Sequence, residues 1–174
     1  MVVAAPGWEE PSILLAEEIG AGKTSAAVPG GERRADSVRA GLAEVPPDVA
    51  VVLVHDAARP LVPADVVDRV IEPLGEDWDG AVPALPLADT VKRAEADAVA
   101  GTVDRSGLVA VQTPQAFLTD MLRQGLAGEG DGTDCSAFVE QAGGRVRLVD
   151  GDRRLVKVTT VADLAFVESL LRVG

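Results

Sequence analysis

The sequence predicts an α/β protein in which helices cover a mostly parallel sheet. Strand-like apolar segments alternate with segments of helical periodicity along the whole chain. Residues 51–54 form an uninterrupted apolar run with three valines, which is typical of a strand buried on both faces. Hydrophobic residues make up 47% of the chain and aromatic residues only 3%, so valine, leucine and alanine must form most of the core.

The N-terminal half predicts two strands, three helices and two loops. A short strand is expected over 1–5, a weakly amphipathic helix within 7–23 and a glycine loop at 29–31. Asp36 is expected to cap the next helix, which Pro46 and Pro47 end. The strand 51–54 is followed by a loop over 55–60 and by a helix over 64–74.

In the C-terminal half, a strand over 81–85 contains Pro83, which favours a sheet edge or a bulge. Short apolar alternations at about 87–111 predict an extended arm resembling a hairpin. Helices over 118–126, 136–141 and 161–172 and strands over 145–149 and 155–158 complete the chain. No repeat or linker interrupts residues 1–174, which are expected to form a single domain.

The overall charge limits the classes of partner. Sixteen basic and 28 acidic residues give a net charge of −12, which repels nucleic acid and anionic membranes. A phosphate substrate would need a local cluster of arginine and lysine, or a divalent cation. The single cysteine excludes an internal disulfide framework, and no apolar run is long enough for a membrane span, so we expect a cytoplasmic protein.

The loop 55–60 is the first candidate site, because ligands of open α/β sheets bind beyond the carboxyl ends of the strands. Asp56 could bind Mg²⁺ and Arg59 could hold a phosphate through two hydrogen bonds. A salt bridge between these two side chains is the structural alternative. His55, the only histidine, follows a buried strand directly, so a scaffold role is favoured over that of a general base.

Other segments carry weaker signals. Gly30 and Gly31 precede a predicted helix and could expose backbone N–H groups to an anion, or simply form a tight capped loop. Residues 20–24, Gly-Ala-Gly-Lys-Thr, imitate the end of a P-loop, but Glu17 occupies the place of the required glycine, so a P-loop is rejected. Cys135 is expected to be a buried structural thiol.

Six segments in this order together resemble the 2-C-methyl-D-erythritol 4-phosphate cytidylyltransferase family. They are Gly-Gly-Glu-Arg-Arg-Ala-Asp-Ser-Val (30–38), Val-Leu-Val-His-Asp-Ala-Ala-Arg-Pro (52–60), Asp-Thr-Val-Lys-Arg (89–93), Thr-Val-Asp-Arg-Ser-Gly-Leu (102–108), Gln-Thr-Pro-Gln-Ala-Phe (112–117) and Val-Lys-Val-Thr-Thr-Val-Ala-Asp-Leu (156–164). The resemblance implies a Rossmann-like nucleotidyltransferase fold, a homodimer formed through the arm, and a requirement for Mg²⁺. It also implies transfer of CMP from CTP to methylerythritol phosphate with release of pyrophosphate.

The resemblance also implies roles for individual residues. Asp56, with Mg²⁺, Arg59 and Lys157 would act on the reacting phosphates, and Thr90, Arg105 and Thr113 would contact the methylerythritol phosphate. Gly31, Glu32 and Ser37 would contact the cytosine base. The family begins with a strand and a Gly-rich loop, Pro-Ala-Ala-Gly-x-Gly-x-Arg, that these residues lack, so weak CTP binding and slow turnover are expected. A ribitol 5-phosphate cytidylyltransferase and a catalytically inert binding or dimerisation module are the alternatives.

Overall fold

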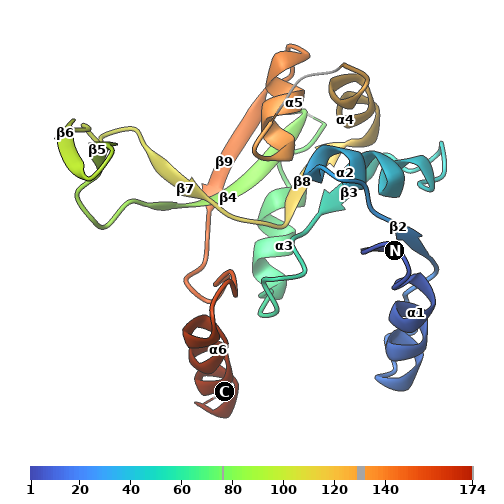
Figure 1. Cartoon of the computed structure of the whole chain (residues 1–174). Coiled ribbons are helices and arrows are strands. Elements are labelled where there is room, and N and C mark those ends of the chain that lie inside the picture. The colour runs from blue at the N-terminus through green and yellow to red at the C-terminus, as the bar shows by residue number, and fades with distance from the viewer. Residues whose placement is uncertain (76, 129–131, 174) are drawn as a thin grey trace.

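The computed structural model describes residues 1–75, 77–128 and 132–173, and it confirms the predicted α/β fold (Figure 1). The elements follow in this order: β1 (Val2–Ala4), α1 (Glu9–Glu18), β2 (Ala27–Pro29), α2 (Arg34–Ala43), β3 (Val51–Val54), α3 (Ala64–Ile71), β4 (Gly80–Pro86), β5 (Lys92–Glu95), β6 (Ala98–Thr102), β7 (Val109–Val111), β8 (Gln115–Leu118), α4 (Thr119–Leu126), α5 (Cys135–Gln141), β9 (Val146–Asp150) and α6 (Val161–Val173).

The main sheet brings several strand ends to one edge. β8 lies between β3 and β4 and is antiparallel to both, whereas β9 is parallel to β4. β3, β4 and β9 therefore run in the same direction, and the loops that follow them leave the sheet at the same edge. The amino end of β8 lies there too, because Gln115 pairs with Val54 at the end of β3. β1 and β2 form a separate parallel pair.

Pro83 does not lie at a sheet edge or a bulge, as its lack of an N–H predicted, but within the central strand β4. Gly80 and Ala81 pair with β8, and Ala84 to Pro86 pair with β7, on the same side of β4. Pro83 lies at the junction of these two partners, where its carbonyl accepts a hydrogen bond from the Gln112 N–H. The junction tolerates proline because no strand requires an N–H there.

Three other expectations were incomplete or wrong. β2 and β8 were not predicted, since they have only three and four residues, and β2 ends in a proline whereas β8 directly follows one. Residues 155–158 form no strand, and a backbone hydrogen bond from the Val158 N–H to the Ala58 carbonyl joins them to the loop after β3. Asp36 is not the N-cap of α2, which begins at Arg34. Its carboxylate instead accepts a hydrogen bond from the Arg33 N–H one turn earlier.

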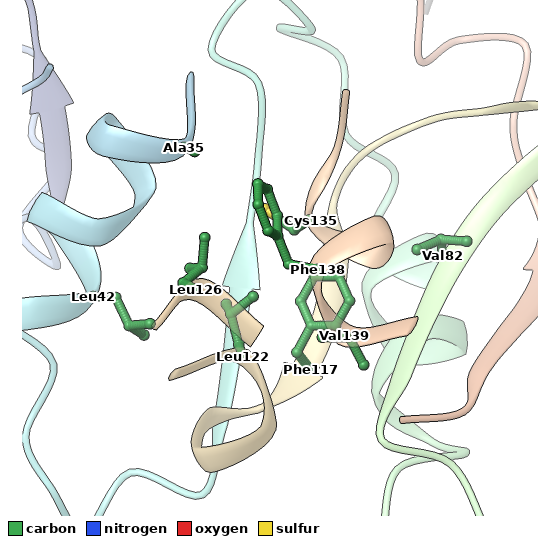
Figure 2. Packing of buried hydrophobic residues seen from close by; sticks show 9 residues of the cluster. All are labelled: Ala35, Leu42, Val82, Phe117, Leu122, Leu126, Cys135, Phe138 and Val139. Atoms are coloured by element: carbon green, nitrogen blue, oxygen red, sulfur yellow. The ribbon is translucent and has the colours of Figure 1, made fainter. Parts of the chain in front are cut away.

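The main core lies between the sheet and the helices α2, α4 and α5, and Figure 2 shows its nine buried residues. Phe117 and Phe138 are its largest members, and each is at most 1% exposed. Gly125 lets α4 approach α5, because a Cβ at this position would lie 2.5 Å from the Phe138 carbonyl oxygen. Because the chain has so few aromatic side chains, close packing of this kind, rather than large side chains, fills the core.

The arm and the helix α6 extend from this body (Figure 1). The hairpin β5–β6 forms the tip of the predicted arm, and β7 returns the chain to the sheet. The helix α6 lies apart from the sheet and exposes Leu164, Phe166 and Leu171. In the described ranges, no helix is long and apolar enough to cross a membrane.

Candidate active site

The loop after β3 is held by a chain of hydrogen bonds that involves His55 and Thr113. The His55 Nε2 lies 2.9 Å from the Arg59 carbonyl, which can only accept, so this nitrogen carries the proton. In the neutral ring Nδ1 then accepts a hydrogen bond from the Thr113 hydroxyl at 3.1 Å, and that hydroxyl accepts one from the Asp56 N–H at 3.0 Å. The scaffold role predicted for His55 is confirmed.

Asp56 lies at the centre of three cationic side chains. The Lys157 Nζ is 3.0 Å from Oδ2, the Arg59 Nε is 3.9 Å from the same oxygen, and the Arg34 Nη2 is 3.8 Å from Oδ1. Partial burial by itself would raise the pKa of Asp56, but the hydrogen bond from Lys157 and the three positive charges hold the pKa below its ordinary value. Asp56 is therefore ionised at neutral pH.

We call Asp56, Arg34, Arg59 and Lys157 the Asp56 cluster. Three cations and one carboxylate give it a net charge of +2, on a chain whose net charge is −12. The local cluster of basic side chains that a phosphate substrate would need is thus present, and the salt bridge that was the alternative explanation for Asp56 and Arg59 is part of it. A surplus of guanidinium and ammonium groups beside a half-buried carboxylate favours the binding of a polyphosphate.

Arg59 is held by a hydrogen bond on one side and by the ion pair with Asp56 on the other. Its Nη1 donates a hydrogen bond to the Leu155 carbonyl, which lies in the segment after β9. Its Nε is buried and has no hydrogen-bond partner among the described residues. Burial lowers the pKa of Arg59, and the nearby Asp56 carboxylate opposes this effect. A guanidinium held in this way needs little reorganisation to bind an anion.

Arg34 is a member of the site that sequence reasoning did not assign. Its Nη1 lies 3.2 Å from the Cys135 sulfur, and its Nη2 faces Asp56. Cys135 is fully buried, as predicted, and burial raises the pKa of its thiol. Arg34 lies inside the segment 30–38 that resembles the family, but the sequence does not reveal that helix α5 and the loop after β3 meet at this side chain.

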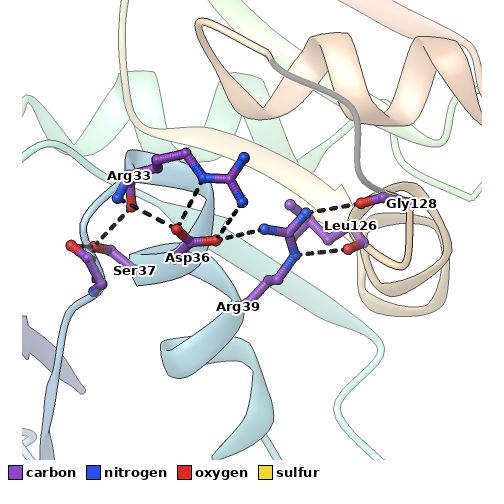
Figure 3. Close-up of polar contacts among 7 residues, drawn as sticks. Arg33, Asp36, Ser37, Arg39, Leu126 and Gly128 are labelled. Atoms are coloured by element: carbon purple, nitrogen blue, oxygen red, sulfur yellow. Dashed lines mark hydrogen bonds and ion pairs between the residues drawn. The ribbon is translucent and has the colours of Figure 1, made fainter.

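The glycine loop folds back onto the start of α2. The Gly31 N–H donates a hydrogen bond to the Ser37 hydroxyl at 3.1 Å, and a Cβ at Gly31 would lie 2.4 Å from the Asp36 Cβ. Asp36 in turn bridges Arg33 and Arg39, as Figure 3 shows. Glu32 is exposed and makes no hydrogen bond or ion pair with any described residue. The loop is thus rigid where Gly31 and Ser37 meet, and Glu32 is free to contact a ligand.

A cleft of about 580 Å³ borders on the Asp56 cluster and on Ser37, the hydrogen-bond partner of the glycine loop. Ser37, Arg34 and Asp56 all line it, and the rest of its wall consists mostly of apolar side chains from β1, α2 and β3. The cleft therefore combines apolar walls with a few polar and charged groups, an arrangement that is common in sites for small ligands.

The structure does not bring every predicted site residue to this cluster. Thr113 is 5% exposed, and its hydroxyl is used by Asp56 and His55, so any contact with substrate requires these bonds to rearrange. Thr90 and Arg105 lie on the arm. The Arg105 Nη1 donates a hydrogen bond to the Leu87 carbonyl at the base of the arm, and among the described contacts neither residue bonds to the cluster.

The sequence model of the 2-C-methyl-D-erythritol 4-phosphate cytidylyltransferase family matches residues 3–173. The chain belongs to this family. The cytidylyltransferase of Saccharopolyspora erythraea is 48% identical over 176 residues, which cover 98% of this chain and 78% of that protein. The enzyme of Streptomyces avermitilis is 46% identical over 181 residues, which cover 98% of this chain and 72% of the relative.

Solved structures of the cytidylyltransferase family show the same fold. A crystal structure of a 4-diphosphocytidyl-2C-methyl-D-erythritol synthase has a TM-score of 0.85 at 36% identity and covers 98% of this chain and 79% of the other. The family member of Thermus thermophilus has a TM-score of 0.78 at 36% identity and covers 85% of this chain and 74% of its own. The predicted family and its nucleotidyltransferase fold are therefore confirmed.

Proposed function

We propose that this cytidylyltransferase transfers CMP from CTP to 2-C-methyl-D-erythritol 4-phosphate and releases pyrophosphate. Membership of the family supports the reaction. The observation that supports assigning it to particular residues is the cationic cluster around Asp56. The relatives named above carry the methylerythritol name, so the ribitol alternative has no observation in its favour.

The geometry supports a direct displacement. A phosphate oxygen of the methylerythritol phosphate attacks the α-phosphorus of CTP, and the bond from that phosphorus to the β-phosphate oxygen breaks. Because the attacking phosphate is already an anion near neutral pH, no base has to remove a proton, and His55 is not required for one. Catalysis then depends on alignment and on neutralising the charge of the phosphates, which Lys157, Arg34 and Arg59 can supply.

The nucleotide and metal sites follow from the same arrangement. The base of CTP would lie at Gly31, Glu32 and Ser37, with its triphosphate directed along the cleft towards Arg34. Among the described residues, no group of three or more His, Cys, Asp or Glu side chains is placed to hold a metal ion. One carboxylate, Asp56, still fits Mg²⁺, because this ion often takes one or two carboxylates and completes its shell with water and substrate phosphates. When bound there, it would neutralise charge on the triphosphate.

We also propose a homodimer in which the arm reaches the partner subunit. The arm exposes Val99, Leu108, Val109 and Val111, and a protein of this size rarely leaves such a group of apolar side chains in water. Thr90 and Arg105 would then complete the partner's site with its methylerythritol phosphate. A cytoplasmic location is part of the proposal, and it is supported by the free, buried thiol of Cys135.

The reaction is tested by pyrophosphate release from purified chain with CTP and Mg²⁺, with and without methylerythritol phosphate. Release that depends on both substrates supports the proposal. Release that ignores the methylerythritol phosphate, or that is faster with ribitol 5-phosphate, would contradict it.

The dimer is tested by light scattering and by mixing two inactive variants. Asp56→Asn removes a residue of the cluster, and Arg105→Gln removes a residue of the arm. If the sites are shared, a mixture of the two should recover about a quarter of the full activity, because one site in two of each mixed dimer is intact, and mixed dimers are about half of the total. A monomer in solution, or no recovery on mixing, would refute the shared site.

A further inference from the structure

A second cleft adjoins the Asp56 cluster through Arg59. It has a volume of about 530 Å³ and lies between the base of the arm and the segment that follows β9. Among the described residues that line it, only Arg59 and Arg153 are charged, and none is acidic. The first cleft, in contrast, is lined by both Arg34 and Asp56. The second cleft is therefore the more positive of the two.

The turn after β9 holds both arginines of this cleft. The Gln112 side chain binds the turn through two hydrogen bonds, donating to the Asp152 carbonyl at 2.9 Å and accepting from the Asp152 N–H at 3.0 Å. Leu155, at the end of the turn, is fully buried, and its carbonyl accepts the hydrogen bond from Arg59. The backbone that carries Arg153 is thus fixed relative to the Arg59 guanidinium.

Arg153 and its neighbour Arg154 differ in their surroundings. The Arg154 guanidinium makes two hydrogen bonds with the Asp152 carboxylate, at 3.0 and 2.8 Å. The Arg153 side chain, in contrast, forms no hydrogen bond and no ion pair with any described residue. Of these two successive cations, one is therefore neutralised within the turn, and the other lines the cleft without a counter-charge.

We propose that Arg153 is a further substrate-positioning residue, which binds the phosphate of the methylerythritol phosphate in the second cleft. This inference rests on the proposed function and assigns the two clefts to different substrates. The first cleft is lined by Ser37, Arg34 and Asp56 and suits the nucleotide, whereas the second shares no lining residue with the first. A planar guanidinium can bind two oxygens of one phosphate at once, and Arg153 and Arg59 line the same cleft, so two positive charges are available there to a phosphate dianion.

Calorimetric titration of the full chain separates the two ligands. Methylerythritol phosphate is titrated in one series, and CTP with Mg²⁺ in the other. We expect Arg153→Gln to weaken the binding of methylerythritol phosphate about tenfold and to change CTP binding less than about twofold, since one charge-assisted contact of an exposed side chain is lost. Arg153→Lys should recover part of the affinity, because a phosphate also accepts a point charge.

Arg154→Gln is the matched control, since it removes the same charge from the next residue, and it should leave both affinities unchanged. Unchanged binding of methylerythritol phosphate in Arg153→Gln, while Arg59→Gln weakens it, would overturn the role of Arg153 and leave the proposed function intact. An equal loss for both ligands would also overturn it, because that result indicates a general electrostatic effect. If the unmodified chain binds CTP but no methylerythritol phosphate, both the inference and the proposed function fail.

Discussion

Lys157→Met tests whether the Asp56 cluster serves catalysis or only stability. The Lys157 Nζ lies 3.0 Å from Asp56 Oδ2, and its side chain is half-exposed. An ion pair with this exposure contributes about 0.5–1 kcal/mol to the free energy of unfolding. In a chain of this length that loss lowers the Tm by about 1–4 °C. If Lys157 instead neutralises charge that develops in the transition state, its loss should lower kcat about 10²–10³-fold.

The two effects are measured on the same samples. Thermal unfolding gives the Tm, and pyrophosphate release at saturating CTP and methylerythritol phosphate gives kcat. Lys23→Met is the control, because Lys23 is an exposed lysine in the turn after α1 and lines neither cleft. A fall in kcat of less than about fivefold for Lys157→Met would refute the catalytic role, since a transition-state contact is worth much more. A fall in Tm above about 8 °C would show that the ion pair is mainly structural.

Three further predictions concern the glycine loop, the contacts of Arg39 with the end of α4, and the pH dependence of stability. Gly31→Ala should weaken CTP binding about tenfold and leave methylerythritol phosphate binding unchanged in calorimetry, because the new Cβ would lie 2.4 Å from the Asp36 Cβ and must displace the loop. Arg39→Ala should lower the free energy of unfolding by about 1–2 kcal/mol in urea titrations, because its guanidinium donates hydrogen bonds to two carbonyls at the C-terminal end of α4; a Tm equal to that of the unmodified chain would contradict this. The folded-state pKa of Asp56 lies below the unfolded value, so its contribution is fully present above the unfolded pKa and is lost as the pH falls through the folded pKa. The stability difference between the unmodified chain and Asp56→Asn should therefore be constant from about pH 7 to 5 and shrink below about pH 4; a difference that shrinks already above pH 5 would be inconsistent with the cluster.

The sequence was most informative where one local pattern determines the structure. The strand 51–54 was predicted with the observed bounds, because four apolar residues between turn residues have few alternatives. The arm was recognised because its short apolar alternations are separated by polar turn segments and show no helical pattern. β8 escaped prediction, since an antiparallel strand between two parallel ones depends on pairing with distant segments rather than on its own four residues. Tertiary pairing also placed Pro83 in the central strand against its local preference.

The site shows the same division between local and distant determinants. Asp56 and Arg59 share one loop, and their chemistry could be inferred from their types and spacing. Lys157 could be assigned only through resemblance to the family, because nothing in its own segment places it 3.0 Å from Asp56. Arg34 was missed although it lies in the segment 30–38 that resembles the family. Its role depends on α5, which brings Cys135 against it, and on the loop after β3, and no local pattern connects these three segments.

The position of Asp56 indicates why a carboxylate belongs in a site for anions. Arg34, Arg59 and Lys157 come from three distant parts of the chain, and without a counter-charge their mutual repulsion would separate them. Asp56 holds them together before any substrate binds, so the site does not have to assemble them during the reaction. The carboxylate repels a triphosphate, but the cluster keeps a net charge of +2 and still attracts it. Losing the arrangement of the three cations would weaken binding more than this repulsion does. Replacing Asp56 with asparagine should therefore reduce the rate even though the site becomes more positive, and a rate that rises instead would show that charge alone, rather than the arrangement of the cations, limits the reaction.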